Sequence, residues 1–383
     1  MRAFYAACLA ACVSVPVWAG DAATAAHLRD QALADNTAWD VVQSLSYEVG
    51  PRPAGSPAAA RARDWAIAKL KALGFTNVHA EAFAKPSWAR GTESADLVAP
   101  YPLKLAMVGL GHSVPTPAGG VEADVVVLDG LSALINAAPN AFAGKIVLIN
   151  QPMTRTEDGA GYGADVAIRY AASEAAKKGA VAYLIRSVST GTGRAPHTGV
   201  SSYRDGLKIP AAALGVPDAD LLAYLAKCGP VRLKLTMQST EQPDTMAWNI
   251  SGDIKGRDKP DEALVIGGHI DSWDPGLGAI DDGAGVAITV AAAKLVASLP
   301  KHPKRTIRVV LWGSEETGGA SEAYLAAHKT ELDKIIVASE SDVGADRIVK
   351  LRLPAGASGQ SALQDVQALL SPLHIIVGRD PAT

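Results

Sequence analysis

The sequence is poor in cysteine, has no excess of positive charge and has no long apolar segment beyond its N-terminus. It contains 3 Cys, and its 36 Lys and Arg residues face 39 Asp and Glu residues, which gives a net charge of −3. A chain without a basic excess is not suited to binding a phosphate backbone. After the first residues, every 18-residue window contains a charge, Pro or Gly. We therefore expect neither nucleic acid binding nor a membrane span.

The first nineteen residues have the pattern of a secretory signal peptide. Arg2 is followed by an apolar run over 3–15, which is too short to span a bilayer, and Val17 and Ala19 place small or apolar residues at −3 and −1 of a cleavage site after Ala19. We expect residues 1–19 to be a signal peptide and the protein to be secreted or periplasmic. A short membrane anchor or lipid attachment at Cys12 are the alternatives. Cleavage would remove two of the three cysteines, so no intramolecular disulfide is expected.

The length of 383 residues is sufficient for two or three folded domains. Turn-rich segments at 113–120 and 239–245 bracket a stretch with its own strand and helix patterns. We expect residues 113–242 to form an inserted domain, between two parts of a main domain at 27–112 and 243–383. Within the insertion, strands are predicted at 123–128, 145–150 and 181–185, and a helix at 170–178.

The rest of the chain alternates between strand and helix patterns. Helical spacing is imperfect over 27–49 and clear over 61–73, and later strands are predicted at 263–266, 306–312 and 334–338, with helices at 285–299 and 320–330. Such alternation predicts an α/β fold with a mixed, mostly parallel sheet flanked by helices.

Each of these three later strands is followed by side chains that bind cations. They are His269 and Asp271, then Glu315 and Glu316, then Asp342, while Asp281 precedes the helix after the first strand. Singly, each has an ordinary structural explanation, such as a turn, a helix cap or a solvated rim. Together they are expected at one sheet edge, where like charges repel unless a cation compensates them. The pattern therefore predicts a metal site, with zinc favoured and manganese or cobalt as alternatives.

A site of this kind supports hydrolysis without a covalent intermediate. A carboxylate can bridge two ions about 3.5–4 Å apart, and a second carboxylate that binds no metal can accept the proton of water. Nucleophilic catalysis has little support, because no Gly-x-Ser-x-Gly motif occurs and Cys228 has no evident partner His.

These motifs resemble a known family. The segments GGHIDSWDPGLGAIDDGAG, KRTIRVVLWGSEETGG and ASESDVGAD resemble the di-zinc exopeptidases of clan MH, most of all the carboxypeptidase Q group and its bacterial secreted relatives. The resemblance implies two Zn²⁺ ions held by His269, Asp281, Glu316 and Asp342, with Asp281 as the bridge. It implies Glu315 as the general base and Asp271 as the carboxylate that orients His269. It also implies a cis peptide bond between Asp281 and Asp282.

The inserted stretch has its own resemblance. The order GKIVLIN, an alanine-rich helix, GAVAYLIRS and IPAAAL is similar to the protease-associated domain of secreted peptidases. His197, in a loop of this stretch, either lines a substrate cleft or is a solvated surface residue.

One departure from the family concerns its last ligand. The family has a further His well beyond the Asp342 position, and His374 follows a different connection, so we do not take it as the substitute. We expect the sequence to be C-terminally incomplete, with the second zinc site lacking a ligand. The resemblance implies a secreted zinc exopeptidase for short peptides, and it leaves aminopeptidase against carboxypeptidase or dipeptidase action open. A non-catalytic binding module or an inactive fragment is the alternative, and a homodimer is left open.

Overall fold

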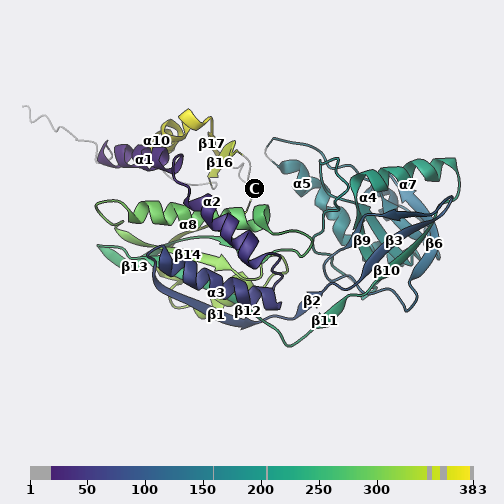
Figure 1. The fold of residues 1–383 in the computed structure, drawn as a ribbon. Coiled ribbons are helices and arrows are strands. Elements are labelled where there is room, and N and C mark those ends of the chain that lie inside the picture. The colour runs from purple at the N-terminus through teal and green to yellow at the C-terminus, as the bar shows by residue number, and fades with distance from the viewer. Residues whose placement is uncertain (1–18, 158, 204–205, 343–346, 354–359, 380–383) are drawn as a thin grey trace, which may run out of the picture. The chain divides into compact units, whose positions relative to one another are not determined.

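The computed structural model describes residues 19–157, 159–203, 206–342, 347–353 and 360–379 (Figure 1). It divides into two compact units. One is Asn36–Asp346, and the other comprises the described residues up to Asp35 and from Arg347 onward. Most of the expected signal peptide lies outside the described residues. Among the helices that the structure describes, none is both long and apolar enough to cross a membrane.

A five-stranded sheet forms the first half of the larger unit. Its strands, in spatial order, are β1 (Thr76–Ala84), β12 (Met246–Ile254), β14 (Arg305–Trp312), β13 (Lys259–His269) and β15 (Ile335–Glu340). Strand β13 runs parallel to both β14 and β15, whereas β1, β12 and β14 pair in antiparallel fashion. The sheet is therefore mixed, as predicted, and its parallel part contains the three strands whose ends carry the cation-binding side chains.

Helices cover both faces of this sheet. In β14, Val309 and Leu311 face a core shared with α2 (Thr37–Ser44), η1 (Leu45–Val49), α3 (Pro57–Ala72) and α8 (Ala284–Ala297). The intervening Val310 and Trp312 face a smaller cluster with Tyr324 of α9 (Ala320–Ala327). This alternation follows from the two-residue period of side chains along a strand. Two short elements, η3 (Ala279–Gly283) and η4 (Leu332–Lys334), precede α8 and β15.

The sequence predicts the bounds of one N-terminal helix well and those of the other poorly. Helix α3 begins four residues before the expected start, because Ser56 caps it by accepting a hydrogen bond from the Ala59 N–H at 3.2 Å and Pro57 fits the first turn. It ends before Gly74, whose φ of +89° suits glycine. The stretch 27–49 is divided among α1 (Ala19–Ala32), α2 and η1, which explains its imperfect helical spacing.

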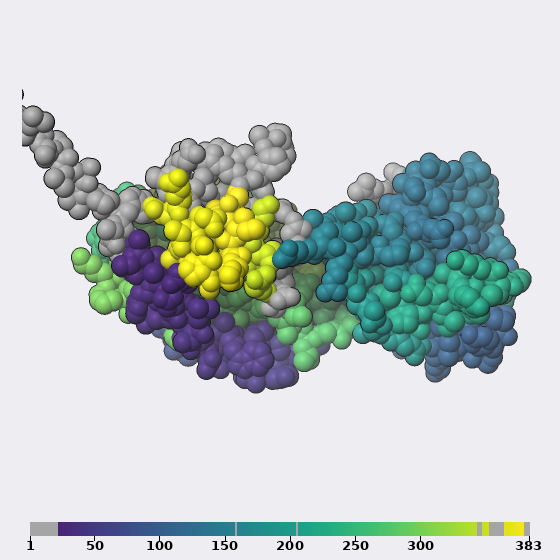
Figure 2. Space-filling view, turned by 90° about the horizontal axis from the view of Figure 1, so that it is seen from above, coloured from purple at the N-terminus to yellow at the C-terminus, as the bar shows by residue number. Residues whose placement is uncertain are grey.

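An eight-stranded sheet forms the second half of the larger unit. Its order is β4 (Leu103–Leu105), β3 (Glu93–Ala99), β10 (Arg232–Met237), β6 (Val121–Leu128), β7 (Ile146–Ile149), β8 (Ala182–Arg186), β9 (Ala211–Leu214) and β5 (Met107–Gly109). Its helices are α4 (Leu131–Ile135), α5 (Ala160–Asp165), η2 (Val166–Tyr170), α6 (Ala172–Lys177) and α7 (Val216–Cys228). The blue and teal atoms of this segment form a body of their own in Figure 2. We call residues 93–237 the second domain.

The second domain starts earlier than the expected boundary at residue 113. Strands β3, β4 and β5 lie before that residue, and the segment 113–120 connects β5 to β6 within the sheet. The chain instead crosses between the two sheets at β2 (Ser87–Ala89) and β11 (Thr240–Gln242), which pair antiparallel with each other.

The smaller unit is built from both ends of the described chain. It contains α1, β16 (Lys350–Leu353), α10 (Gln360–Leu370), η5 (Ser371–Leu373) and β17 (Ile376–Arg379). Strands β16 and β17 pair in parallel, and Arg29 Nη1 donates to the Leu369 carbonyl at 3.0 Å.

Candidate active site

The cation-binding side chains lie at one edge of the five-stranded sheet. His269 ends β13 and is level with Trp312, the last residue of β14, while Gly267 is level with Glu340, the last residue of β15. Because these strands are parallel, the segments after their carboxyl ends meet at the same edge. Residue 269 and the segments that begin at 313 and 341 are therefore neighbours, as the sequence predicted.

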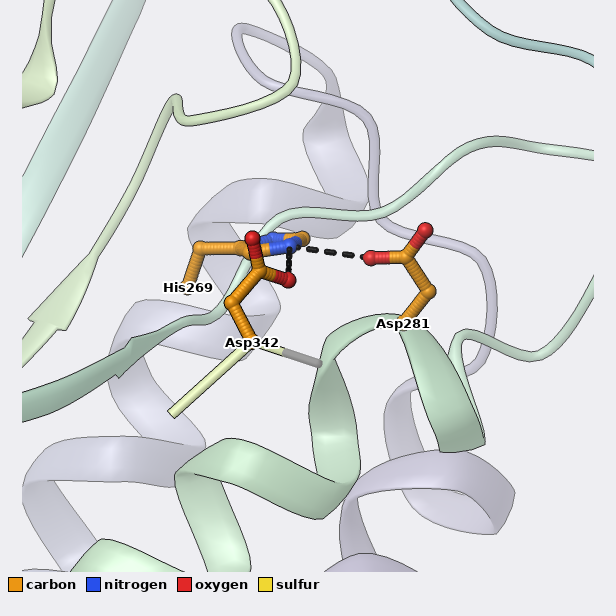
Figure 3. A group of neighbouring side chains, drawn as sticks. All are labelled: His269, Asp281 and Asp342. Atoms are coloured by element: carbon orange, nitrogen blue, oxygen red, sulfur yellow. Dashed lines mark hydrogen bonds and ion pairs between the residues drawn. The ribbon is translucent and has the colours of Figure 1, made fainter. Parts of the chain in front are cut away.

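Three of the predicted ligands form one compact group. His269 Nε2 lies 3.0 Å from Asp281 Oδ1 and 3.3 Å from Asp342 Oδ1 (Figure 3). One ligand atom from each of the three residues lies within 4.8 Å of the others. Both carboxylates therefore point at the same imidazole nitrogen, which is an arrangement that a single ion between them would complete.

The charges of this group fit a bound cation. Burial acts to lower the pKa of His269, but the hydrogen bonds that its ring donates to the carboxylates of Asp271, Asp281 and Asp342 outweigh it and raise that pKa. The hydrogen bond with His269 in turn holds the pKa of Asp281 below its usual value. The imidazole of His269 with the carboxylates of Asp281 and Asp342 is a donor set that suits zinc, which takes His nitrogen and carboxylate oxygen at tetrahedral positions.

Asp271 lies behind His269, on the side away from the other two carboxylates. His269 Nδ1 is 3.0 Å from the backbone carbonyl of Asp271 and 3.5 Å from its Oδ1. Both residues are buried, at 1% and 2% exposure. A carbonyl can only accept, so Nδ1 carries the proton and Nε2 is left free to bind a metal.

The two glutamates after β14 occupy different surroundings. Glu315 is partly exposed, and its Oε2 lies 4.0 Å from His269 Nε2. Burial raises its pKa, and the nearby Asp342 raises it further. Glu316 lies outside the group of three: Trp273 Nε1 donates to its Oε2, while its buried Oε1 has no hydrogen-bond partner. Burial and the Asp281 charge raise the pKa of Glu316 to about 8.

Asp281 and Asp282 face opposite environments. The peptide bond between them is cis, as the resemblance implied. Asp282 is 1% exposed and accepts hydrogen bonds from the backbone N–H groups of His269 at 3.0 Å and Gly285 at 2.9 Å. Burial raises its pKa to about 7. Asp282 therefore joins the end of β13 to the start of α8, while Asp281 faces the metal group.

Glycine permits this close approach. A Cβ at Gly285 would lie 1.8 Å from the Ser341 carbonyl oxygen, and a Cβ at Gly268 would lie 2.6 Å from Asp282 Oδ2. A side chain at Gly285 would push the segment of Asp342 away from the start of α8, and one at Gly268 would push Asp282 away from β13.

Arg52 is a residue that sequence reasoning missed. It is fully buried, and its guanidinium donates to the backbone carbonyls of Gly50, Ile270, Leu277 and Gly278. These contacts connect the segment before α3 to the loop between His269 and Asp281. Burial lowers the pKa of Arg52 to about 10, although three nearby aspartates oppose this. The only sequence signal was an arginine between two prolines, which is also typical of an exposed turn.

Comparison with known proteins identifies relatives of the chain. Residues 249–382 match peptidase family M28. Carboxypeptidase Q of Mus musculus is 38% identical over 343 residues, which are 89% of this chain and 72% of that protein. Carboxypeptidase Q of Homo sapiens is 37% identical over 345 residues, with coverage of 89% and 72%.

Solved structures agree with this assignment. A peptidase M28 precursor from Shewanella amazonensis SB2B is 41% identical, with a TM-score of 0.90 over 94% of this chain and 83% of that chain. The aminopeptidase from Aneurinibacillus sp. strain AM-1, at 22% identity, has a TM-score of 0.58 over 90% and 80%, and so shares the fold. The predicted α/β class is confirmed. The extent and identity of the carboxypeptidase Q matches establish that this chain is a metallopeptidase of peptidase family M28.

Proposed function

We propose that the protein is a secreted or periplasmic zinc exopeptidase that hydrolyses short peptides. The observation that carries this proposal is the convergence of Asp281 Oδ1 and Asp342 Oδ1 on His269 Nε2, with Glu315 Oε2 at 4.0 Å. Secretion is supported by the N-terminal pattern of residues 1–19.

The chain offers donors for two ions. His269, Asp281 and Asp342 would hold one of them, and Asp281 has a second carboxylate oxygen with which to bridge to another. Glu316 would serve the second ion, since its buried Oε1 has no partner and its surroundings disfavour a free negative charge. Zinc held by these residues would lower the pKa of a bound water and polarise the scissile carbonyl group.

Glu315 has the properties of the general base. Its Oε2 lies 4.0 Å from His269 Nε2, farther than the carboxylates of Asp281 and Asp342, it is partly exposed, and its raised pKa brings it nearer to neutral pH. It would accept a proton from the attacking water and return it to the leaving amine. Asp271 holds the backbone N–H of Glu315 at 3.0 Å and thereby positions the base.

The names of the relatives are compatible with cleavage at either the N-terminus or the C-terminus of a peptide. Carboxypeptidase Q and aminopeptidases are both similar to this chain, and the metal group itself does not select a terminus. A non-catalytic binding role is less well supported, because a protein that only binds peptides has no need of Glu315 beside the metal ligands.

The experiment compares zinc content and peptide hydrolysis in the zinc-loaded protein and in Glu315→Gln. We expect the variant to keep its zinc, measured by metal analysis after dialysis, and to lose several orders of magnitude in kcat, because an amide cannot accept the proton. Glu241→Gln, at an exposed position of β11, is the matched control and should be unaffected. Near-normal turnover by Glu315→Gln would remove this residue from the base role.

A further inference from the structure

The loop that follows β13 contacts the second domain through Trp273. A Cβ at Gly111, a buried residue of the second domain, would lie 2.0 Å from Cη2 of Trp273 and 2.5 Å from its Cζ3. The six-membered ring of the indole therefore lies directly against the backbone of Gly111, in space that only a glycine leaves open. This backbone is itself fixed, because the Gly111 N–H donates to the Gly199 carbonyl at 2.9 Å and the Gly111 carbonyl accepts from the Ser201 N–H at 2.8 Å.

The opposite edge of the same indole contacts the candidate metal site. Trp273 Nε1 donates a hydrogen bond to Oε2 of Glu316. Oε1 of this carboxylate is buried and has no hydrogen-bond partner among the described residues. Carboxylates that bind a metal are usually oriented by hydrogen bonds from neighbouring groups. Trp273 thus holds one oxygen of Glu316 and leaves the other for an ion.

A second contact ties the same loop to the second domain. Arg90, which lies between β2 and β3, donates from Nε to both carboxylate oxygens of Asp274, at 3.0 and 2.8 Å. Its Nη1 donates to the Gly109 carbonyl at 2.6 Å and to the Glu93 carboxylate at 3.0 Å. The side chains of Arg90 and Asp274 are 11% and 28% exposed, so salt screens this pair less than a pair at the surface. Two adjacent residues of the loop are therefore held at the end of β5.

The rest of the candidate site is held within the five-stranded sheet. His269 is the last residue of β13, and Asp342 lies just after the end of β15. The backbone N–H of Glu315 is held by Asp271, two residues after β13. The two halves of the site therefore differ in their support, since the indole that holds Glu316 is the one that rests on the second domain.

We propose that Trp273 is a positioning residue through which the second domain sets the orientation of Glu316 and, with it, the affinity of the second zinc ion. The inference rests on the proposed function, in which Glu316 serves that ion, and extends it by giving the second domain a part in metal binding. The ion held by His269, Asp281 and Asp342 should bind whether or not Trp273 is in place.

The test measures both zinc affinities by titration against a chromogenic chelator. Trp273→Phe keeps a ring beside Gly111 but removes the N–H donor, so the affinity for the weaker zinc equivalent should fall by about 10- to 100-fold, while the tighter one changes by less than about 3-fold. Gly111→Ala keeps the donor but displaces the ring, and should lower the same affinity by about 3- to 30-fold. Gly193→Ala, where a Cβ meets open space in the second domain, is the matched control and should change neither.

Two further measurements separate positioning from a loss of structure. The Tm of metal-free Trp273→Phe should stay within about 3 °C of that of the unaltered protein, and excess zinc should restore its turnover. An equal loss of both zinc affinities, or an unchanged weaker affinity, in Trp273→Phe would overturn the proposal. This variant decides the matter even if Gly111→Ala does not fold.

Glu316→Gln shows which of the two proposals is wrong. If it loses the weaker equivalent while Trp273→Phe keeps it, Glu316 is a ligand that Trp273 does not position. If Glu316→Gln keeps both equivalents, its ligand role in the proposed function is wrong, and this inference is wrong with it. Selective zinc loss in Trp273→Phe without any peptide hydrolysis by the unaltered protein would contradict the peptidase proposal and support the positioning role.

Discussion

The backbone N–H of Glu315 donates a 3.0 Å hydrogen bond to Oδ1 of Asp271, and the same oxygen lies 3.5 Å from Nδ1 of His269. One buried carboxylate thus contacts both the loop after β14 and the histidine at the end of β13. The proposed base and the proposed metal ligand are thereby held at a fixed separation.

We expect Asp271→Ala to lower both zinc affinity and kcat/KM by about 10- to 100-fold, because His269 and Glu315 each lose a positioning contact. Asp271→Asn retains an oxygen acceptor for the Glu315 N–H and should lose less. Zinc titration with a competing chelator, together with a dipeptide assay, measures both effects. Unchanged affinity and turnover in Asp271→Ala would show that the backbone carbonyl alone orients His269.

Glu316→Gln should differ from Glu315→Gln in its zinc content. Removal of its charge takes away the donor proposed for the second ion, so zinc content after dialysis should fall, and activity should fall with it. Added zinc should restore part of the activity of Glu316→Gln but none of that of Glu315→Gln. A Glu316→Gln variant with full zinc content would exclude Glu316 as a ligand.

Zinc should stabilise the protein more strongly as the pH rises from 5 to 8. In the metal-free site the pKa of Glu316 is raised to about 8 and that of Asp282 to about 7, both above their values in an unfolded chain. The stability from these groups is present at low pH and is lost as the pH rises toward those values. Zinc bound at Glu316 would keep its carboxylate ionised and would offset this loss. The difference in Tm between zinc-loaded and chelated protein should therefore widen over this range, and a constant or narrowing gap would contradict the assignment.

Arg52→Met should destabilise the protein and weaken zinc binding. The substitution keeps the apolar stem but removes a donor from four backbone carbonyl groups, of which those of Gly50 and Ile270 are buried, at a cost of about 3 kcal/mol. Because Leu277 and Gly278 lie in the loop that leads to Asp281, zinc affinity should also fall. Urea unfolding and zinc titration measure the two effects, with Arg61→Met, at an exposed position of α3, as the control. Normal zinc affinity in a folded Arg52→Met variant would show that the loop holds its shape unaided.

Elements with local signals could be predicted from the sequence. Helix α3 has Ser56 before a proline and Gly74 after its end, and both act within one turn of the helix. The second domain boundary depends instead on β3 pairing with β10 far along the chain. The sequence of a short strand does not indicate which distant strand it pairs with. Residues 93–109 could therefore not be assigned to that sheet from the sequence.

Some residues of the candidate site could likewise be predicted from the sequence, and others could not. His269, Asp281 and Asp342 were predicted together because parallel strands bring their carboxyl ends to one edge, and the structure does gather them. Glu316 was predicted in the same ligand set but turns toward Trp273. Arg52 was missed, because burial of an arginine depends on tertiary packing and leaves no pattern in the neighbouring residues.

The strands of the eight-stranded sheet lie in the sequence between β1 and β12 of the five-stranded sheet, and this order affects how the two sheets form during synthesis. The second domain is a single uninterrupted stretch of the chain. Strand β1, by contrast, can pair only after β12 has been made, because Thr76 and its partner Asp253 are 177 residues apart in the sequence. Domains generally fold as units, in the order in which they leave the ribosome. We therefore expect the second domain to fold before the strands that carry the metal ligands have been made, so that His269, Asp281 and Asp342 come together afterwards.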